Sequence, residues 1–198
     1  MSAGAHEEHH YTTFGVDNRK LGMWLLITSE CMLFGTLIVT YMIYRTKSVV
    51  GPHPTEVLSI GVTTISTFVL LMSSFSIVLA LHAIQHDDHP RFRKWILITA
   101  IGGLVFLGFQ TFEFTEFVHQ GLALSTNVFG SSFFMLTGTH GTHVAVGVIW
   151  LLSLYFSSLR GKLREDAAIK VDTMALYWHF VDVIWIIIFT VVYLFVFV

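Results

Sequence analysis

Residues 174–198 read MALYWHFVDVIWIIIFTVVYLFVFV, and this stretch decides the fold class. It is 25 residues long and holds a single residue of the Asp, Glu, Lys and Arg group, Asp182. A helix needs about 20 mostly apolar residues to cross the hydrocarbon core of a bilayer. The run is continuously apolar and lacks the alternation typical of a barrel strand. We therefore expect it to form a membrane-spanning helix.

Four further runs of the same kind precede it, at Leu21–Tyr44, Val57–Leu81, Trp95–Val118 and Val128–Leu154. The composition agrees with them, because 54% of the 198 residues are hydrophobic and 12% are charged. A soluble domain carries about twice that share of charge. We predict an all-α, polytopic membrane protein. A five-helix transmembrane domain over residues 21–198 follows a polar head over residues 1–20, which lacks the form of a signal peptide.

Lys and Arg residues are distributed unevenly among the segments that flank the five runs. Nine lie on the side of the amino terminus, in alternate segments, and two lie on the other side. Since positively charged loops stay in the cytoplasm, we expect a cytoplasmic amino terminus and a carboxyl terminus outside. The net charge of −2 and the lack of a long basic run argue against a nucleic-acid partner. The single cysteine, Cys31, excludes a disulfide framework and any metal site that needs two thiolates from this chain.

Seven acidic or imidazole side chains lie inside the predicted spans, and no Lys or Arg lies there with them. They are Glu30, Glu113, Glu116, His140, His143, His179 and Asp182. Ionisable residues within a membrane usually face the bundle interior or a partner, and an acid without a partner there is expected to be neutral. The last six form pairs three residues apart, so the members of each pair share one helix face. We predict that the third, fourth and fifth spans turn these faces toward a shared polar interior.

Each of these residues has a structural and a functional interpretation. We expect the imidazoles of the fourth span to be satisfied by neighbouring carboxylates, and His179 to hydrogen-bond Asp182. Glu30 has no obvious partner in its own span, so a functional and a structural role are equally open for it.

Two metal-binding alternatives and one transport alternative compete with a purely structural role. Glu116 and His119 fit the Glu-x-x-His signature of a di-iron bundle, but the sequence holds no second copy. Haem between His179 and a histidine of the fourth span is conceivable, but the basic residues that could hold its propionates all lie outside the spans. An independent proton conductor could use the acids as a relay.

Four motifs resemble subunit III of the haem–copper respiratory oxidases, in the short five-helix form found in bacteria. They are GTHGTHVAVG at 138–147, YWHFVDVIW at 177–185, GFQTFEF at 108–114, and LGMW at 21–24 followed by Ser29 and Glu30. The motifs occur in order in four of the five spans, so the resemblance covers essentially the whole chain. Longer members of the family have two further amino-terminal helices, which form one arm of a lipid-filled cleft.

The resemblance implies a non-catalytic subunit of a proton-pumping aa3-type terminal oxidase in the bacterial cytoplasmic membrane. Such an oxidase passes electrons from cytochrome c to dioxygen and makes water; a quinol oxidase is the alternative. Haem and copper would lie in partner subunits and none in this chain, while a phospholipid would bind. Subunit I would be the direct partner, with subunit II and a small subunit IV nearby, and this chain would stabilise subunit I and support proton uptake.

The resemblance also assigns roles to individual residues. Glu30 corresponds to the membrane carboxylate of the family that reacts with hydrophobic carbodiimides. Five other residues match polar positions of the bundle interior: Glu113, His140, His143, His179 and Asp182.

Overall fold

The computed structural model describes residues 17–47, 60–161, 163 and 167–195. Within these residues the chain forms helices α1 (Asn18–Tyr44), α3 (Ile60–Gln85), α4 (His89–His119), α5 (Val128–Leu159) and α6 (Ala167–Phe189), and α6 continues into the π-helical turn η1 (Thr190–Leu194). All five long helices of this part of the chain are long and apolar enough to cross a membrane. The prediction of a five-helix membrane domain is therefore confirmed. Most of the predicted polar head, residues 1–16, lies outside the described residues.

Several helices extend beyond the predicted spans. Helix α4 begins at His89, ahead of the predicted Trp95, because the Asp88 side chain caps it by accepting a hydrogen bond from the backbone N–H of Arg91 at 3.1 Å. Pro90 lies in the first turn, where a missing N–H costs nothing. Helix α6 likewise begins at Ala167, before the predicted Met174. A helix can therefore extend beyond its apolar run, at either end, through polar residues at the bilayer surface.

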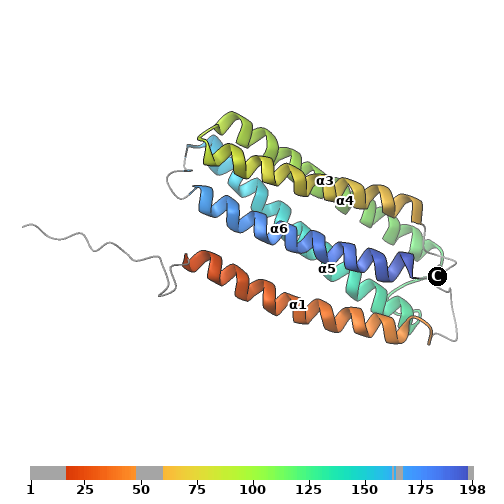
Figure 1. Cartoon of the computed structure of the whole chain (residues 1–198). Helices are drawn as coiled ribbons and strands as arrows, with labels where there is room; N and C mark the ends of the chain where they lie inside the picture. Colours follow the sequence, from red (N-terminus) through yellow and green to blue (C-terminus); the bar gives the residue numbers. More distant parts are fainter. Residues whose placement is uncertain (1–16, 48–59, 162, 164–166, 196–198) are drawn as a thin grey trace, which may run out of the picture.

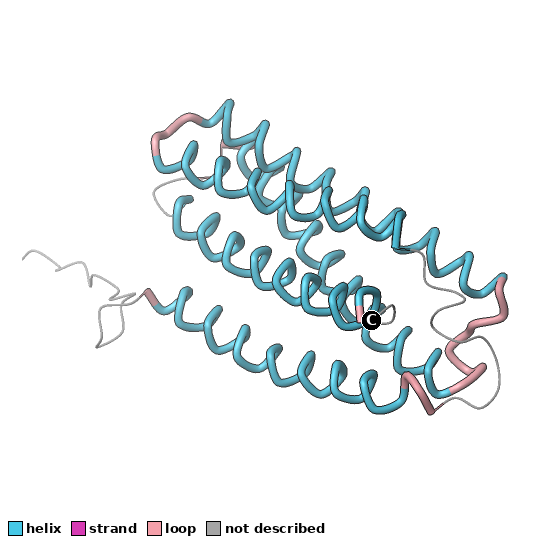
Figure 2. The backbone as a smooth tube through the Cα atoms, turned by 45° about the vertical axis from the view of Figure 1, so that its right-hand side comes forward, coloured by secondary structure: helices cyan, strands magenta, loops and turns pink. Residues whose placement is uncertain are grey.

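The helices lie side by side in one bundle (Figure 1). Helix α6 lies between α1 and the α3–α4 pair, and α5 crosses behind it in this view. The turned view of Figure 2 keeps α1 at the edge of the bundle. Helix α1 contacts α5 and α6, whereas α6 also contacts α3. Helix α6 is the central helix of the bundle, because it contacts α1, α3 and α5 and is the most buried of the five long helices among the described residues.

Trp178 of α6 occupies the centre of the core and is fully buried. A Cβ atom on Gly103 of α4 would lie 2.7 Å from the Trp178 ring, and one on Gly147 of α5 would also lie 2.7 Å from it. Real Cβ contacts are not that short. The two glycines therefore let α4 and α5 lie close to the six-membered ring of the indole.

Candidate functional site

Hydroxyl side chains along α3 bond to polar side chains of α6. The indole N–H of Trp185 donates to the Thr67 hydroxyl at 2.9 Å. That of Trp178 donates to the Ser73 hydroxyl at 3.0 Å. One residue further along α3, the hydroxyl of Ser74 donates to Asp182. Buried indole N–H groups need such partners, so this seam fixes the register between the two antiparallel helices.

Ser74 joins His179 and Asp182. Its hydroxyl donates to Asp182 Oδ2 and lies 3.1 Å from His179 Nδ1. Since the single hydroxyl hydrogen goes to the carboxylate, the Ser74 oxygen accepts from a protonated Nδ1 of His179. The predicted direct bond between His179 and Asp182 is wrong: the two side chains meet at a hydroxyl of another helix. The second oxygen of Asp182 is buried and has no hydrogen-bond partner among the described residues.

Glu113 and Glu116 lie in different surroundings. Glu113 is buried and accepts a hydrogen bond from Thr63 of α3. Glu116 is exposed and accepts a bond from Gln120 Nε2 at 3.0 Å. The prediction that Glu116 faces the bundle interior is therefore wrong. Side chains three residues apart differ by about 60° around a helix, and near the end of α4 that angle takes Glu116 out of the bundle.

His140 is packed by aromatic rings. Its imidazole is fully buried and stacks on Trp185, with ring centroids 4.9 Å apart, while Phe106 meets it edge-on at 5.8 Å. Neither ring nitrogen has a hydrogen-bond partner among the described residues. The expectation that a carboxylate satisfies this imidazole is wrong.

His143 pairs with Glu30 across the contact between α5 and α1. Its Nε2 lies 3.2 Å from Glu30 Oε2, and its Nδ1 lies 2.8 Å from the Thr139 carbonyl. Because a carbonyl only accepts, Nδ1 must carry a hydrogen. The Nε2–Oε2 contact then needs one more proton, on either the imidazole or the carboxyl group. Glu30, which has no partner in its own span, therefore finds one on the fourth span.

The Glu30–His143 pair borders a hollow of about 260 Å³. Its other lining side chains come from Leu26, Thr142, Val146 and Tyr177. The Tyr177 hydroxyl donates to the His143 carbonyl at 3.0 Å and holds the backbone that carries the imidazole. About a fifth of each side chain of the pair is exposed, 20% for Glu30 and 19% for His143. The pair is thus reachable from the side of the bundle.

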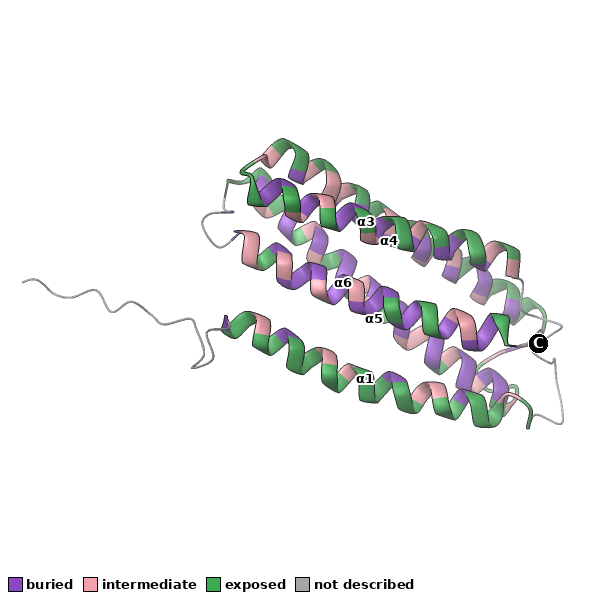
Figure 3. Ribbon diagram, in the orientation of Figure 1, coloured by how far each residue is buried: buried purple, intermediate pink, exposed green. Residues whose placement is uncertain are grey.

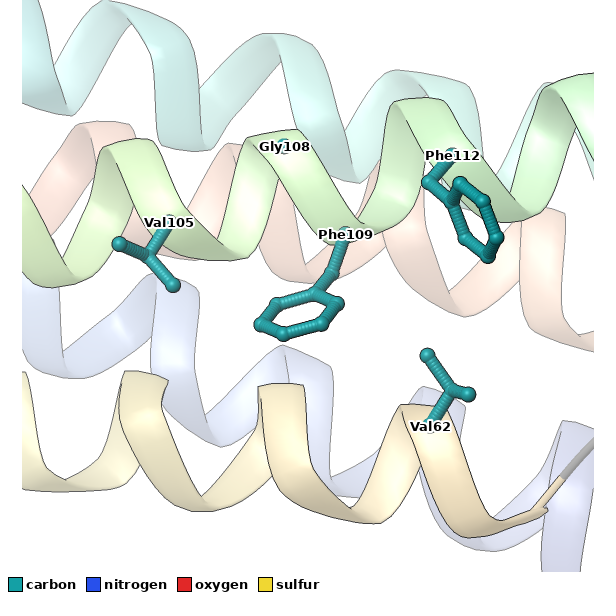
Figure 4. Close-up of a pocket in the computed structure, with 5 residues that line it drawn as sticks. All are labelled: Val62, Val105, Gly108, Phe109 and Phe112. Atoms are coloured by element: carbon teal, nitrogen blue, oxygen red, sulfur yellow. The ribbon is translucent and has the colours of Figure 1, made fainter.

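A different hollow, between α3 and α4, has only apolar side chains around it. It measures about 450 Å³, and Phe109 and Val62 point into it from the two helices (Figure 4). Gly108 also borders it, and a Cβ there would meet nothing within 4 Å. The side chains around this hollow can pack against an apolar partner, and none of them can donate or accept a proton.

The predicted polar residues therefore occupy separate places and share no single interior. Glu113 bonds α3, His179 and Asp182 bond Ser74, and the pair of Glu30 and His143 lies toward α1. Sequence reasoning missed the partners on α3, which are Thr63, Thr67, Ser73 and Ser74. Their recurrence along one otherwise apolar span was the signal that could have found them.

These features define a class of protein: a polytopic helical membrane protein in which three of the four predicted intramembrane acids and two of the three imidazoles bond to a second helix. Comparisons with known proteins identify the family within that class. Residues 1–197 match the family described as "Cytochrome c oxidase subunit III". The chain belongs to this family. It is a subunit III of a haem–copper oxidase and a multi-pass protein of a bacterial membrane.

Several relatives match nearly the whole chain. Cytochrome c oxidase subunit 3 of Bacillus sp. strain PS3 is 40% identical over 177 residues, which is 89% of this chain and 86% of the relative. Quinol oxidase subunit 3 of Bacillus subtilis strain 168 is 39% identical over 174 residues, 88% and 85% of the two chains. Probable quinol oxidase subunit 3 of Staphylococcus saprophyticus is 39% identical over 176 residues, 88% of each chain.

Proposed function

We propose that this chain is a non-catalytic, accessory subunit of a proton-pumping aa3-type terminal oxidase. It stabilises subunit I by direct contact and supports proton uptake there. The observation that carries the proposal is the use of the intramembrane acids: Glu30, Glu113 and Asp182 each bond to another helix of this chain. Acids bonded in this way connect the helices of the bundle, which supports a structural role for them.

The same proposal covers cofactors, partners and orientation. The haem and copper of the oxidase belong to partner subunits, with subunit II and a small subunit IV near subunit I. The apolar outer side of α1, where Leu25 is 65% and Met32 is 73% exposed, offers contact area for a phospholipid or another subunit. The uneven distribution of Lys and Arg favours a cytoplasmic amino terminus.

Glu30 is proposed to be the reactive membrane carboxylate. Its side chain is partly exposed beside an apolar hollow and lies 3.2 Å from His143, so one proton can be held between the two groups. A hydrophobic carbodiimide could reach it from the bilayer.

For the electron donor we propose cytochrome c. A quinol is the second candidate, because two of the similar proteins named above are quinol oxidase subunits. Oxygen consumption by the purified complex, measured with reduced cytochrome c and then with a quinol, separates the two.

A tag on this chain tests the accessory role. The tagged chain should co-purify with haem- and copper-containing subunits, whereas the chain isolated from them should show no haem absorption. Deleting it should leave the initial rate of oxygen reduction nearly intact and shorten the time before activity is lost. Haem bound to the isolated chain, or proton flux through it alone in liposomes, would overturn the proposal.

A further inference from the structure

The turn between α3 and α4 carries a hollow that none of the proposed roles uses. It measures about 410 Å³, and its lining combines apolar Leu79 and Trp95 with polar His82, His86, Asp88 and Arg91. Leu79 lies two turns before the end of α3 and Trp95 lies two turns into α4, so the apolar part is on the bilayer side. The polar part lies where both helices reach the membrane surface.

Asp88 orients the guanidinium of Arg91 toward this hollow. One carboxylate oxygen lies 3.2 Å from Arg91 Nε, and the other accepts the backbone N–H of Arg91 at 3.1 Å. The terminal nitrogens of Arg91 bond to no other described residue, and its side chain is 77% exposed. A guanidinium held by Nε with its outer nitrogens open suits the oxygens of a phosphate group.

Two stacked imidazoles complete the polar part. The rings of His82 and His86 lie 4.3 Å apart at an angle of 28°. His86 Nδ1 lies 2.9 Å from the His82 carbonyl and therefore carries a hydrogen. Nε2 of neutral His86 can then only accept a hydrogen bond, whereas protonated His86 donates one. The other charged and titratable side chains that line the hollow are His82, Asp88 and Arg91.

We propose that this hollow binds the headgroup phosphate of an anionic phospholipid. Arg91 and protonated His86 donate to the phosphate, and an acyl chain lies along Leu79 and Trp95. The lining favours a lipid over a free anion because half of it is apolar. The site lies apart from the Glu30 hollow and does not depend on the proposed function.

Lipid retention by the full chain in its oxidase complex tests this. The complex is placed in nanodiscs of phosphatidylcholine with phosphatidylglycerol, then extracted, and the retained lipids are counted by native mass spectrometry at about pH 5.5 and about pH 8. The wild type should retain phosphatidylglycerol in preference to phosphatidylcholine, and more of it at the lower pH. Arg91→Gln should weaken this retention about tenfold, the scale of one lost charge-assisted bond.

Matched variants make the result specific. Lys94→Gln removes a neighbouring cation that does not line the hollow, and it should change retention by less than about twofold. Arg91→Lys should retain more lipid than Arg91→Gln and less than the wild type, because lysine keeps the positive charge but lacks the planar guanidinium with its several N–H donors. His86→Gln should retain lipid with little pH dependence, since an amide donates without a proton.

Three outcomes would overturn the proposal. The first is equal retention of the two lipids by the wild type. The second is equal weakening by Arg91→Gln and Lys94→Gln, which would indicate diffuse attraction only. The third is displacement of the lipid by inorganic phosphate at millimolar concentration, which would make the site one for a free anion.

Discussion

Helices α1 and α6 are both apolar enough to cross a membrane, yet their surroundings differ sharply. In the most apolar 18 residues of each helix, 11% of residues are buried in α1 and 56% in α6. Figure 3 shows the contrast as a mostly exposed α1 beside a largely buried α6. Hydrophobicity therefore identifies a span, and other properties of the sequence decide where in the bundle it lies.

The two helices are also held differently. Helix α6 places two buried indoles and Asp182 against hydroxyls of α3. Helix α1 is tied by an ion pair from Lys20 to Asp172 near its start and by the Glu30–His143 pair further along. We expect the buried hydrogen bonds between α6 and α3 to contribute more to stability than the contacts of α1, because partly exposed ion pairs contribute little.

The largest difference is expected between two tryptophans. Trp178→Ala removes a fully buried indole from the core and should lower the free energy of unfolding by about 3–5 kcal/mol. Trp24→Ala on α1, where the indole is 54% exposed, should cost less than about 0.5 kcal/mol. Unfolding in mixed detergent and denaturant micelles measures both. Equal costs would mean that α6 is not the central helix.

A second pair of variants probes how closely α4 approaches α6. Gly103→Ala would place a Cβ 2.6 Å from Val148 and 2.7 Å from Trp178, so overpacking should cost about 1–3 kcal/mol. Gly108→Ala on the same helix meets nothing within 4 Å and should leave stability unchanged or slightly raised. The same unfolding assay compares them. A tolerated Gly103→Ala would contradict the close approach.

A smaller effect is expected at the hydroxyl seam. Ser74→Ala leaves both oxygens of buried Asp182 without a hydrogen-bond donor, which should cost about 1–2 kcal/mol. Ser153→Ala serves as the control, because among the described residues that exposed hydroxyl bonds the Trp150 carbonyl of its own helix and no other group. A double-mutant cycle with Asp182→Asn should show coupling between the two sites. Additive costs would argue against the Ser74–Asp182 bond.

Much of the fold could be predicted from the sequence because each helix contains one long apolar run. The helix ends could not, since the stretch from His89 to Lys94 is too rich in charged and polar residues to belong to an apolar run, and its helical form depends on the Asp88 cap. The central position of α6 could not be predicted from the sequence either. It follows from the fit of Trp178 against Gly103 and Gly147, which are distant in the sequence.

The candidate site was predicted only in part. An ionisable residue in a span must find a partner, and Glu30, Glu113 and Asp182 each have one on another helix. Spacing within one helix shows which residues share a face, but it says nothing of the helix opposite. Ser74 therefore replaced the expected bond between His179 and Asp182, and Trp185 took the place of a carboxylate beside His140.

The smallest effect on stability is expected at the α1 contact. Glu30→Gln should cost less than about 1 kcal/mol, because the amide can still donate to His143 Nε2 and the pair is partly exposed. Haem content of the purified complex should stay unchanged, while labelling of this chain by a hydrophobic carbodiimide should be lost. Glu116→Gln, at an exposed acid bonded to Gln120, should leave the labelling intact. If Glu30→Gln instead abolished haem incorporation, α1 would be essential for assembly, and its loose attachment in the bundle would have to be completed by contacts with a partner subunit.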